Sequence, residues 1–448
     1  MRKDERSLSP SSSAGTTSPV RPERPSQTQD RHDWGMLALA WLLYFAFAST
    51  LASLFPLVGI IRTDLDLTYA QVGVVLGGWQ LVYLLAAIPT GVLVDRFQPK
   101  TVLFVGTLVV AGSQVARSFA DGFIPLLLAV AILGLGGPVM SVGLPKVIAE
   151  FFAGRHRSTA SGIYLTGAHL GQVAALALTM PLLHAVNDSW RNTLRIHAVL
   201  IVLIAITWLL LAKRVDRSAV IAAGTGVMTG LRRVATIPAV WLIVTVGFAG
   251  FLGSHGYRSW LPTMIADKGF SATAAGLVAA IPALSGIVGS IVVVRFMSVR
   301  SRRVTAIVLL FLVGASMLAA AMTTGPVLLV AVALEGFCAA ALMPLMMNAL
   351  MEMPQVGAAR MGAAASLYFT IGEMGGFAGP SLIGFVVGLT GSFTLGVLVL
   401  SLTMWAMILP AARIPRRLPP EGRERSLGLV SDEGPTRLGA PPSRCTAE

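Results

Sequence analysis

Long apolar runs dominate the chain between residues 34 and 412. Polar stretches divide them into twelve segments, each close to the roughly 20 residues that a helix needs to cross a bilayer. The segments lack the alternation of period two that is typical of a membrane β-barrel. In hydrocarbon, every backbone amide must pair within its own element, so helices are predicted. We expect them at 34–61, 70–94, 101–119, 122–147, 159–184, 191–212, 238–264, 271–297, 303–322, 325–350, 361–388 and 391–412.

The composition of the chain also indicates that these segments lie in a lipid bilayer. Only 12% of the residues are charged and 55% are hydrophobic, whereas a soluble domain carries about 25% charged residues. The fold class predicted is an all-α membrane protein with twelve transmembrane helices in two six-helix repeats. The predicted domains are a disordered cytoplasmic N-tail (1–33), a six-helix bundle (34–212), a cytoplasmic linker (213–237), a second six-helix bundle (238–412) and a disordered cytoplasmic C-tail (413–448).

The net charge of +13 comes from basic residues that lie mainly in alternate loops and in both tails. Such an excess marks the cytoplasmic side of membrane proteins. We therefore expect a multi-pass protein of the cell (inner) membrane with both termini in the cytoplasm, and no nucleic-acid partner. The two cysteines, Cys338 and Cys445, form no metal-binding spacing. No cofactor or metal is expected.

The two halves of the chain resemble each other. The string GVLVDRF at 91–97 aligns with SIVVVRF at 290–296, and SGIYLTGAHLG at 161–171 aligns with ASLYFTIGEMG at 365–375. Several such matches in order indicate a duplicated six-helix unit. Parallel repeats of this kind occur in two-domain transporters, where the solute site lies between the repeats.

The turn after the second predicted helix carries a recognisable motif. The sequence GVLVDRFQPK at 91–100 resembles the cytoplasmic-loop signature of the major facilitator superfamily, apart from Gln98 and Pro99. This resemblance implies a cytoplasmic gate, in which glycine allows close helix approach and charged residues lock the inner face. Its candidate residues are Gly91, Asp95, Arg96 and Lys100.

A narrower resemblance covers residues 144–171 and 257–276, which are similar to the cyanate-permease and nitroimidazole-exporter branch. The Gly-Pro pair that antiporters of the superfamily carry in helix five is missing, and GGFAGP occurs at 375–380 instead. The arginine of helix four found in many proton-coupled members is also absent. The mode of ion coupling therefore stays open.

Ionisable residues inside a bilayer are costly, so each one is a candidate functional group. His169 and Glu373 lie near the middle of helices five and eleven, at repeat-related positions, and Thr166 and Thr370 lie three residues earlier on similar faces. We expect His169 and Glu373 on opposite walls of one cavity. Glu335, near the middle of helix ten, is a further candidate for proton coupling. The alternative for each is a buried group that is satisfied by hydrogen bonds to its neighbours.

The outer part of helix seven carries His255, Tyr257 and Arg258. The guanidinium group can bind a carboxylate-like anion through two parallel hydrogen bonds. The alternative is that the arginine extends to the outer lipid headgroups.

The expected function is secondary active transport by alternating access. The chain lacks His-Glu-x-x-His, Gly-x-Ser-x-Gly and Walker sequences, so we do not expect an enzyme. A membrane sensor, the distant alternative, would carry a soluble signalling domain. We expect a monomeric symporter whose partners are a small organic or inorganic anion, protons and the lipid bilayer. The alternative is an exporter of small amphipathic compounds.

Overall fold

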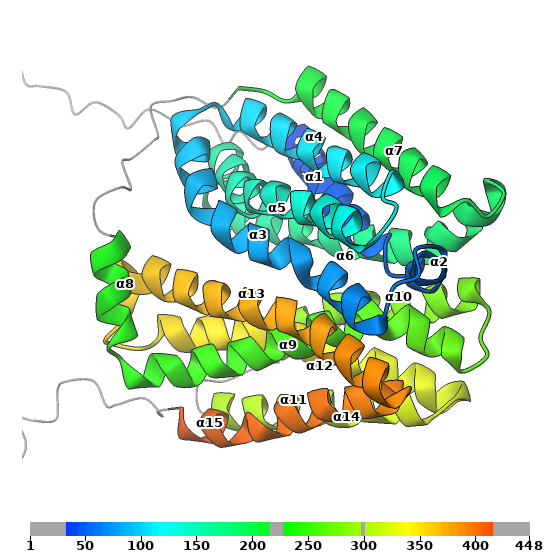
Figure 1. Ribbon diagram of the computed structural model, residues 1–448. Coiled ribbons are helices and arrows are strands. Elements are labelled where there is room, and N and C mark those ends of the chain that lie inside the picture. Colours follow the sequence, from blue (N-terminus) through cyan, green and yellow to red (C-terminus); the bar gives the residue numbers. More distant parts are fainter. Residues whose placement is uncertain (1–32, 215–226, 297–300, 415–448) are drawn as a thin grey trace, which may run out of the picture.

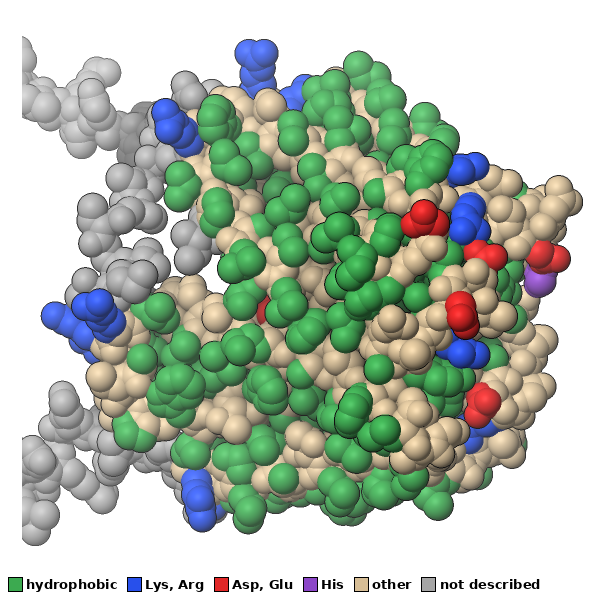
Figure 2. Space-filling view, viewed as in Figure 1, with side chains coloured by type: hydrophobic (Ala, Val, Ile, Leu, Met, Phe, Trp, Pro, Cys, Tyr) green, Lys and Arg blue, Asp and Glu red, His purple; other side chains and the backbone are tan. Residues whose placement is uncertain are grey.

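The computed structural model describes residues 33–214, 227–296 and 301–414. Residues 1–32 and 415–448 of the predicted tails and residues 215–226 of the predicted linker lie outside these ranges. Twelve helices among the described residues are long and apolar enough to cross a membrane. Figure 2 shows hydrophobic side chains over the middle of the molecule and charged side chains towards its two ends. The protein is therefore an all-α, multi-pass membrane protein.

The helices that precede residue 212 lie together in one bundle, in the upper part of Figure 1. A short helix, α2, separates the first two long ones. The helices are α1 (Trp34–Ala52), α2 (Val58–Asp64), α3 (Tyr69–Arg96), α4 (Pro99–Ser118), α5 (Phe123–Phe151), α6 (Gly154–Ala185) and α7 (Trp190–Leu211).

The remaining helices form a second bundle in the lower part of Figure 1. Both ends of the described chain, Asp33 and Ile414, lie on the same side of the molecule, which we call the terminus end; the other side is the far end. The helices are α8 (Val227–Ala235), α9 (Pro238–Asp267), α10 (Ala272–Phe296), α11 (Arg302–Met322), α12 (Gly325–Met351), α13 (Gly357–Thr390), α14 (Phe393–Ala406) and α15 (Ile408–Arg413).

The first predicted segment, 34–61, is not one helix. It divides into α1 and α2 around Pro56, because proline lacks an amide hydrogen and clashes with the preceding turn. A buried arginine stabilises the end of α1: Nη1 of Arg117 on α4 donates to the carbonyl of Thr50 at 3.1 Å. This bond pairs one of the carbonyls that a helix end leaves without a partner.

Glycines bring the two bundles into backbone contact in the far half of the molecule. A Cβ atom on Gly77 of α3 would lie 2.6 Å from the carbonyl oxygen of Phe377 on α13, and one on Gly73 would lie 2.5 Å from that of Pro380. Such approach between helices is possible only for residues without a side chain at the contact. Trp260 of α9 adds a hydrogen bond of 2.9 Å from Nε1 to the same Pro380 carbonyl.

A second glycine contact joins α6 to α10. A Cβ atom on Gly276, near the start of α10, would lie 2.3 Å from the carbonyl oxygen of Leu176 in the far part of α6. The two contacts, α3 with α13 and α6 with α10, therefore close the far end between the bundles.

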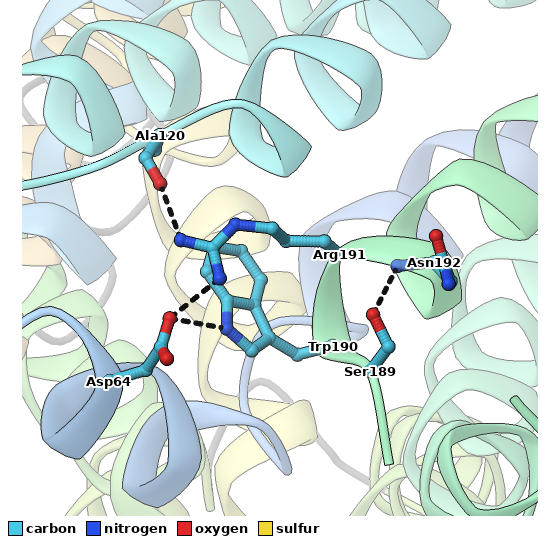
Figure 3. Close-up of polar contacts among 6 residues, drawn as sticks. All are labelled: Asp64, Ala120, Ser189, Trp190, Arg191 and Asn192. Carbon is cyan, nitrogen blue, oxygen red and sulfur yellow. Dashed lines mark hydrogen bonds and ion pairs between the residues drawn. The ribbon is translucent and has the colours of Figure 1, made fainter. Parts of the chain in front are cut away.

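The far end of the first bundle is tied together by Asp64 (Figure 3). Its Oδ2 atom accepts hydrogen bonds from Nη1 of Arg191 at 2.6 Å and from Nε1 of Trp190 at 3.0 Å. Arg191 also donates to the carbonyl of Ala120 at 3.2 Å, and the side chain of Ser189 caps α7. This cluster connects α2, the turn between α4 and α5, and the start of α7.

Replacing Gly77 by valine is expected to prevent closure of the far end. The new side chain would collide with backbone rather than with a flexible side chain, and overpacking of this kind costs about 1–3 kcal/mol. Distances between spin labels at the far ends of the two bundles should increase. Gly112→Val is the matched control, because a Cβ atom there meets nothing within 4 Å. Equal label distances in both variants would contradict the closure model.

Asp64 is expected to stabilise the fold in a pH-dependent way. Hydrogen bonds from Arg191 and Trp190 lower the pKa of its carboxyl group. A carboxyl whose pKa is lower in the folded state stabilises that state above its unfolded pKa, and the contribution is lost as pH falls through the folded pKa. Because Asp64 is 43% exposed and Arg191 is 35% exposed, Asp64→Asn should cost only about 0.2–1 kcal/mol.

Thermal unfolding as a function of pH tests this expectation for Asp64. The stability difference between the parent protein and Asp64→Asn should be full at neutral pH and should shrink only as the pH falls below about 4 and through the lowered pKa of Asp64. An equal stability difference at neutral pH and at acid pH would show that Asp64 stabilises the fold through the packing of its side chain and not through its charge.

Candidate functional site

A cavity of about 670 Å³ lies between the two bundles. Its walls come from α1 and α6 of the first bundle and from α9, α10, α12 and α13 of the second. Thr159, Ser290 and Met346 place it in the terminus-end parts of α6, α10 and α12. Figure 2 shows a hollow between the two halves on that side. Since the far end is closed, the cavity opens towards the terminus end.

Arg258 is the only Asp, Glu, Lys or Arg residue among the described residues that line the cavity. It is half-buried on α9, one turn beyond Ser254 and His255, which also line the cavity. Its Nε atom is buried without a hydrogen-bond partner among the described residues. The side chain therefore lies in the cavity wall and not among lipid headgroups, and it offers a single positive charge.

The first bundle contributes neutral polar groups from α6. Thr166 donates from Oγ1 to the carbonyl of Ile163 at 2.7 Å and accepts a hydrogen bond of 3.0 Å from Nε1 of Trp41. His169 lines the cavity with its Nδ1 atom 3.3 Å from the carbonyl of Leu165. Both predicted residues of this bundle thus lie in the cavity wall.

A polar junction links the bundles beside the cavity. Nε2 of Gln80 on α3 lies 3.1 Å from Nδ1 of His255 on α9. A Cβ atom placed on Gly376 of α13 would lie 2.9 Å from Gln80 Nε2, 3.4 Å from Oε2 of Glu373 and 3.4 Å from Cδ2 of His255. The three side chains therefore meet around Gly376, where α3, α9 and α13 converge.

Glu373 is buried in this junction and does not line the cavity. Its Oε2 atom and Oε1 of Gln80 accept no hydrogen bond from any described residue. The expectation that His169 and Glu373 occupy opposite walls is therefore wrong for Glu373. Glu373 instead meets Gln80 of α3 and His255 of α9 around Gly376.

Three other predicted residues also lie away from the cavity wall. Glu335 is fully buried in α12, and neither of its oxygens has a hydrogen-bond partner among the described residues. Tyr257 is buried in α9, and its hydroxyl group also has no hydrogen-bond partner among the described residues. Thr370 is exposed on α13 and is not a lining residue. The sequence predicted all three as residues of the substrate or proton pathway. In the structure, each side chain lies on a face of its helix that does not line the cavity.

Sequence reasoning missed Tyr44, Ser254 and Ser290 in the cavity wall, and Gln80 at the junction. Each is a polar residue within an apolar segment, which is a signal that an inspection restricted to ionisable groups overlooks. No cluster of three His, Cys, Asp or Glu residues that could hold a metal ion occurs in the described part of the chain.

The sequence matches the Major Facilitator Superfamily over residues 40–380, with a second match over 266–437. The chain belongs to the Major Facilitator Superfamily. Among solved structures of this fold, a bacterial homologue of the human lysosomal transporter Spinster, in an inward-facing and occupied conformation, superposes with a TM-score of 0.68. That match covers 85% of this chain and 95% of the other at 16% identity.

Two curated relatives are identical to this chain at about a quarter of the aligned positions. A hexuronate transporter of Bacillus subtilis is 24% identical over 80% of this chain and 88% of the relative. A probable galactarate/D-glucarate transporter of the same species is 24% identical over 76% of this chain and 82% of the relative. Both alignments cover at least three quarters of this chain.

The superfamily motif lies at the turn between α3 and α4. Nζ of Lys100 donates to the carbonyl of Ala212 at 2.6 Å, which ties this turn to the end of α7. Arg96 is exposed at the last turn of α3, and the side chain of Asp95 lies outside the described residues. A Cβ atom on Gly91 would meet nothing within 4 Å. The close helix approach expected at Gly91 is therefore absent when the cavity is open at this end.

Proposed function

We propose that this protein transports small anions across the cell membrane by alternating access. The observation that carries the proposal is Arg258, the one Asp, Glu, Lys or Arg residue among the described residues that line the central cavity. A cation held in a site of low polarity attracts an anion strongly, and the arginine fork matches a carboxylate. The names of the relatives, a hexuronate transporter and a probable galactarate/D-glucarate transporter, support an anionic solute.

The proposed orientation places the terminus end in the cytoplasm, because most basic residues of the chain lie in the loops and tails on that side. The cavity then opens to the cytoplasm. Residues 34–212 and 238–412 would move as two units, and the protein would act as a monomer. The finer resemblance of residues 144–171 and 257–276 to the cyanate-permease and nitroimidazole-exporter branch belongs to this proposal.

We also propose that protons couple to the anion through Glu373, with Glu335 and His169 as further candidates. Burying an unpaired carboxylate costs several kcal/mol, so a buried carboxyl is favoured as the neutral acid. Glu373 faces His255 of α9 and Gln80 of α3, and Tyr44 of α1 and Tyr83 of α3 lie within electrostatic range of it. Opening of the far end would separate Gln80 from His255 and expose this carboxyl group.

Arg258→Ala is expected to weaken anion binding about 10- to 100-fold, because a hydrogen bond to a charged group contributes about 1.5–3 kcal/mol. The measurement is the thermal shift of purified protein against a panel of small organic and inorganic anions, since a ligand of the folded state raises its stability. Arg232→Ala is the control, because Arg232 is exposed on α8 and does not line the cavity. Stabilisation by amphipathic cations alone would contradict anion transport and favour the exporter of cationic compounds.

Glu373→Gln is expected to abolish accumulation of the anion driven by a pH gradient and to preserve anion exchange across the membrane. The amide keeps the shape of the neutral acid but cannot release a proton. Proteoliposomes with a pH gradient, and separately with equal pH and unlabelled anion inside, distinguish the two activities. Unchanged pH dependence in both Glu373→Gln and Glu335→Gln would eliminate these carboxyl groups as proton sites.

A further inference from the structure

The walls of the cavity indicate the chemical class of the anion. We propose that the substrate is an amphipathic monocarboxylate, with one carboxylate group on a compact apolar, preferably aromatic, body. This inference rests on the proposed anion transport and adds the substrate class to it. The class differs from that of the sugar acids in the names of the relatives.

The charge of the cavity suits one carboxylate. Arg258 can bind a single carboxylate through two parallel hydrogen bonds. A second carboxylate would need a second cation, and the described lining residues include no other Lys or Arg. His255 has its Nδ1 atom engaged with Gln80. A monoanion therefore fits better than a dianion.

The polar and the apolar lining residues of the cavity come mainly from different helices. Arg258, Ser254, His255, His169 and Thr166 belong to α6 and α9. The wall made by α10 and α12 is almost entirely apolar. Its side chains include Ile287, Ile291, Leu342, Met343 and Met346.

The one hydroxyl group in the apolar wall is already engaged. Among the described lining residues of α10 and α12, Ser290 alone carries a hydroxyl group, and it donates to the carbonyl of Ile287 at 3.0 Å. The remaining atoms of a ligand whose carboxylate binds Arg258 share the cavity with these apolar side chains. The hydroxyl groups of a sugar acid would lose water there without gaining donors or acceptors, whereas an apolar body gains from burial.

Several aromatic rings also line the cavity. The ring of Phe251 lies 6.1 Å from that of Tyr368 in an edge-to-face arrangement and 5.8 Å from that of His255 in a stacked arrangement. All three residues line the cavity, together with Tyr44 of the first bundle. Aromatic pairs favour offset-stacked and edge-to-face geometries. This surface therefore suits a flat aromatic body beside Arg258.

The test compares four probes that differ in one property each. Phenylacetate is an apolar monoanion, glucuronate is a hydroxylated monoanion, phthalate is an aromatic dianion, and phenylacetamide is uncharged. Binding to the full-length purified protein is measured by thermal shift and by titration calorimetry. We expect phenylacetate to bind at least about tenfold more tightly than each of the other three, because unpaired polar groups discriminate strongly in an apolar site.

Variants of the apolar wall test the cause of this preference. Met343→Asn should weaken phenylacetate binding about tenfold and should leave glucuronate binding unchanged or improved. Met343→Leu keeps an apolar side chain of similar volume and should keep the preference. The thermal stability of each variant without ligand shows whether it is folded. Should Met343→Asn fail to fold, Ile291→Asn serves as the second polar variant of the same wall.

The outcomes separate this inference from the proposed function. Equal or tighter binding of glucuronate or phthalate would overturn the substrate class and would leave anion transport standing. Equal binding of phenylacetamide would overturn the role of the carboxylate. Stabilisation by amphipathic cations, with no response to any anion, would overturn anion transport itself.

Discussion

The arrangement of the two bundles depends above all on the backbone approach of α13 to α3, one of the two glycine contacts that close the far end. At positions 73, 77 and 384 glycine leaves no side chain at the contact, so carbonyl groups of one helix lie against the Cα atoms of the other. Because this contact occupies the far half of both helices, their terminus-end halves diverge. The cavity, its opening and the meeting of Gln80 with His255 all follow from this arrangement.

Electrostatics links that contact to the substrate site. His255 lies in the cavity wall three residues before Arg258, and it also bonds across the bundles to Gln80. Glu373 meets the same imidazole ring around Gly376 and is not itself a lining residue of the cavity. A change in charge at Arg258, caused by a bound anion, can therefore reach a buried carboxyl group through one side chain. In an environment of low dielectric such interactions extend further than they do in water.

The helices that line the cavity differ in polarity. The helices α6 and α9 contribute its charged and most of its polar residues, whereas α10 and α12 present mainly aliphatic and thioether side chains. An alternating-access transporter must release its solute after each cycle. A single charged anchor combined with non-directional apolar contacts binds a solute without enclosing it in a rigid network of hydrogen bonds.

The sequence by itself determined the helical fold, the number of spans and the superfamily, because the bilayer permits few backbone solutions and each leaves a long apolar run. It also singled out Arg258 and His169, since an ionisable residue in such a run is conspicuous. Only the tertiary structure decided that Glu373, Glu335 and Thr370 lie away from the cavity wall and that Gln80 meets His255. The direction of a side chain depends on the rotation of its helix and on its neighbours, and the glycine contacts that set this rotation join residues about 300 positions apart in sequence, such as Gly77 and Phe377.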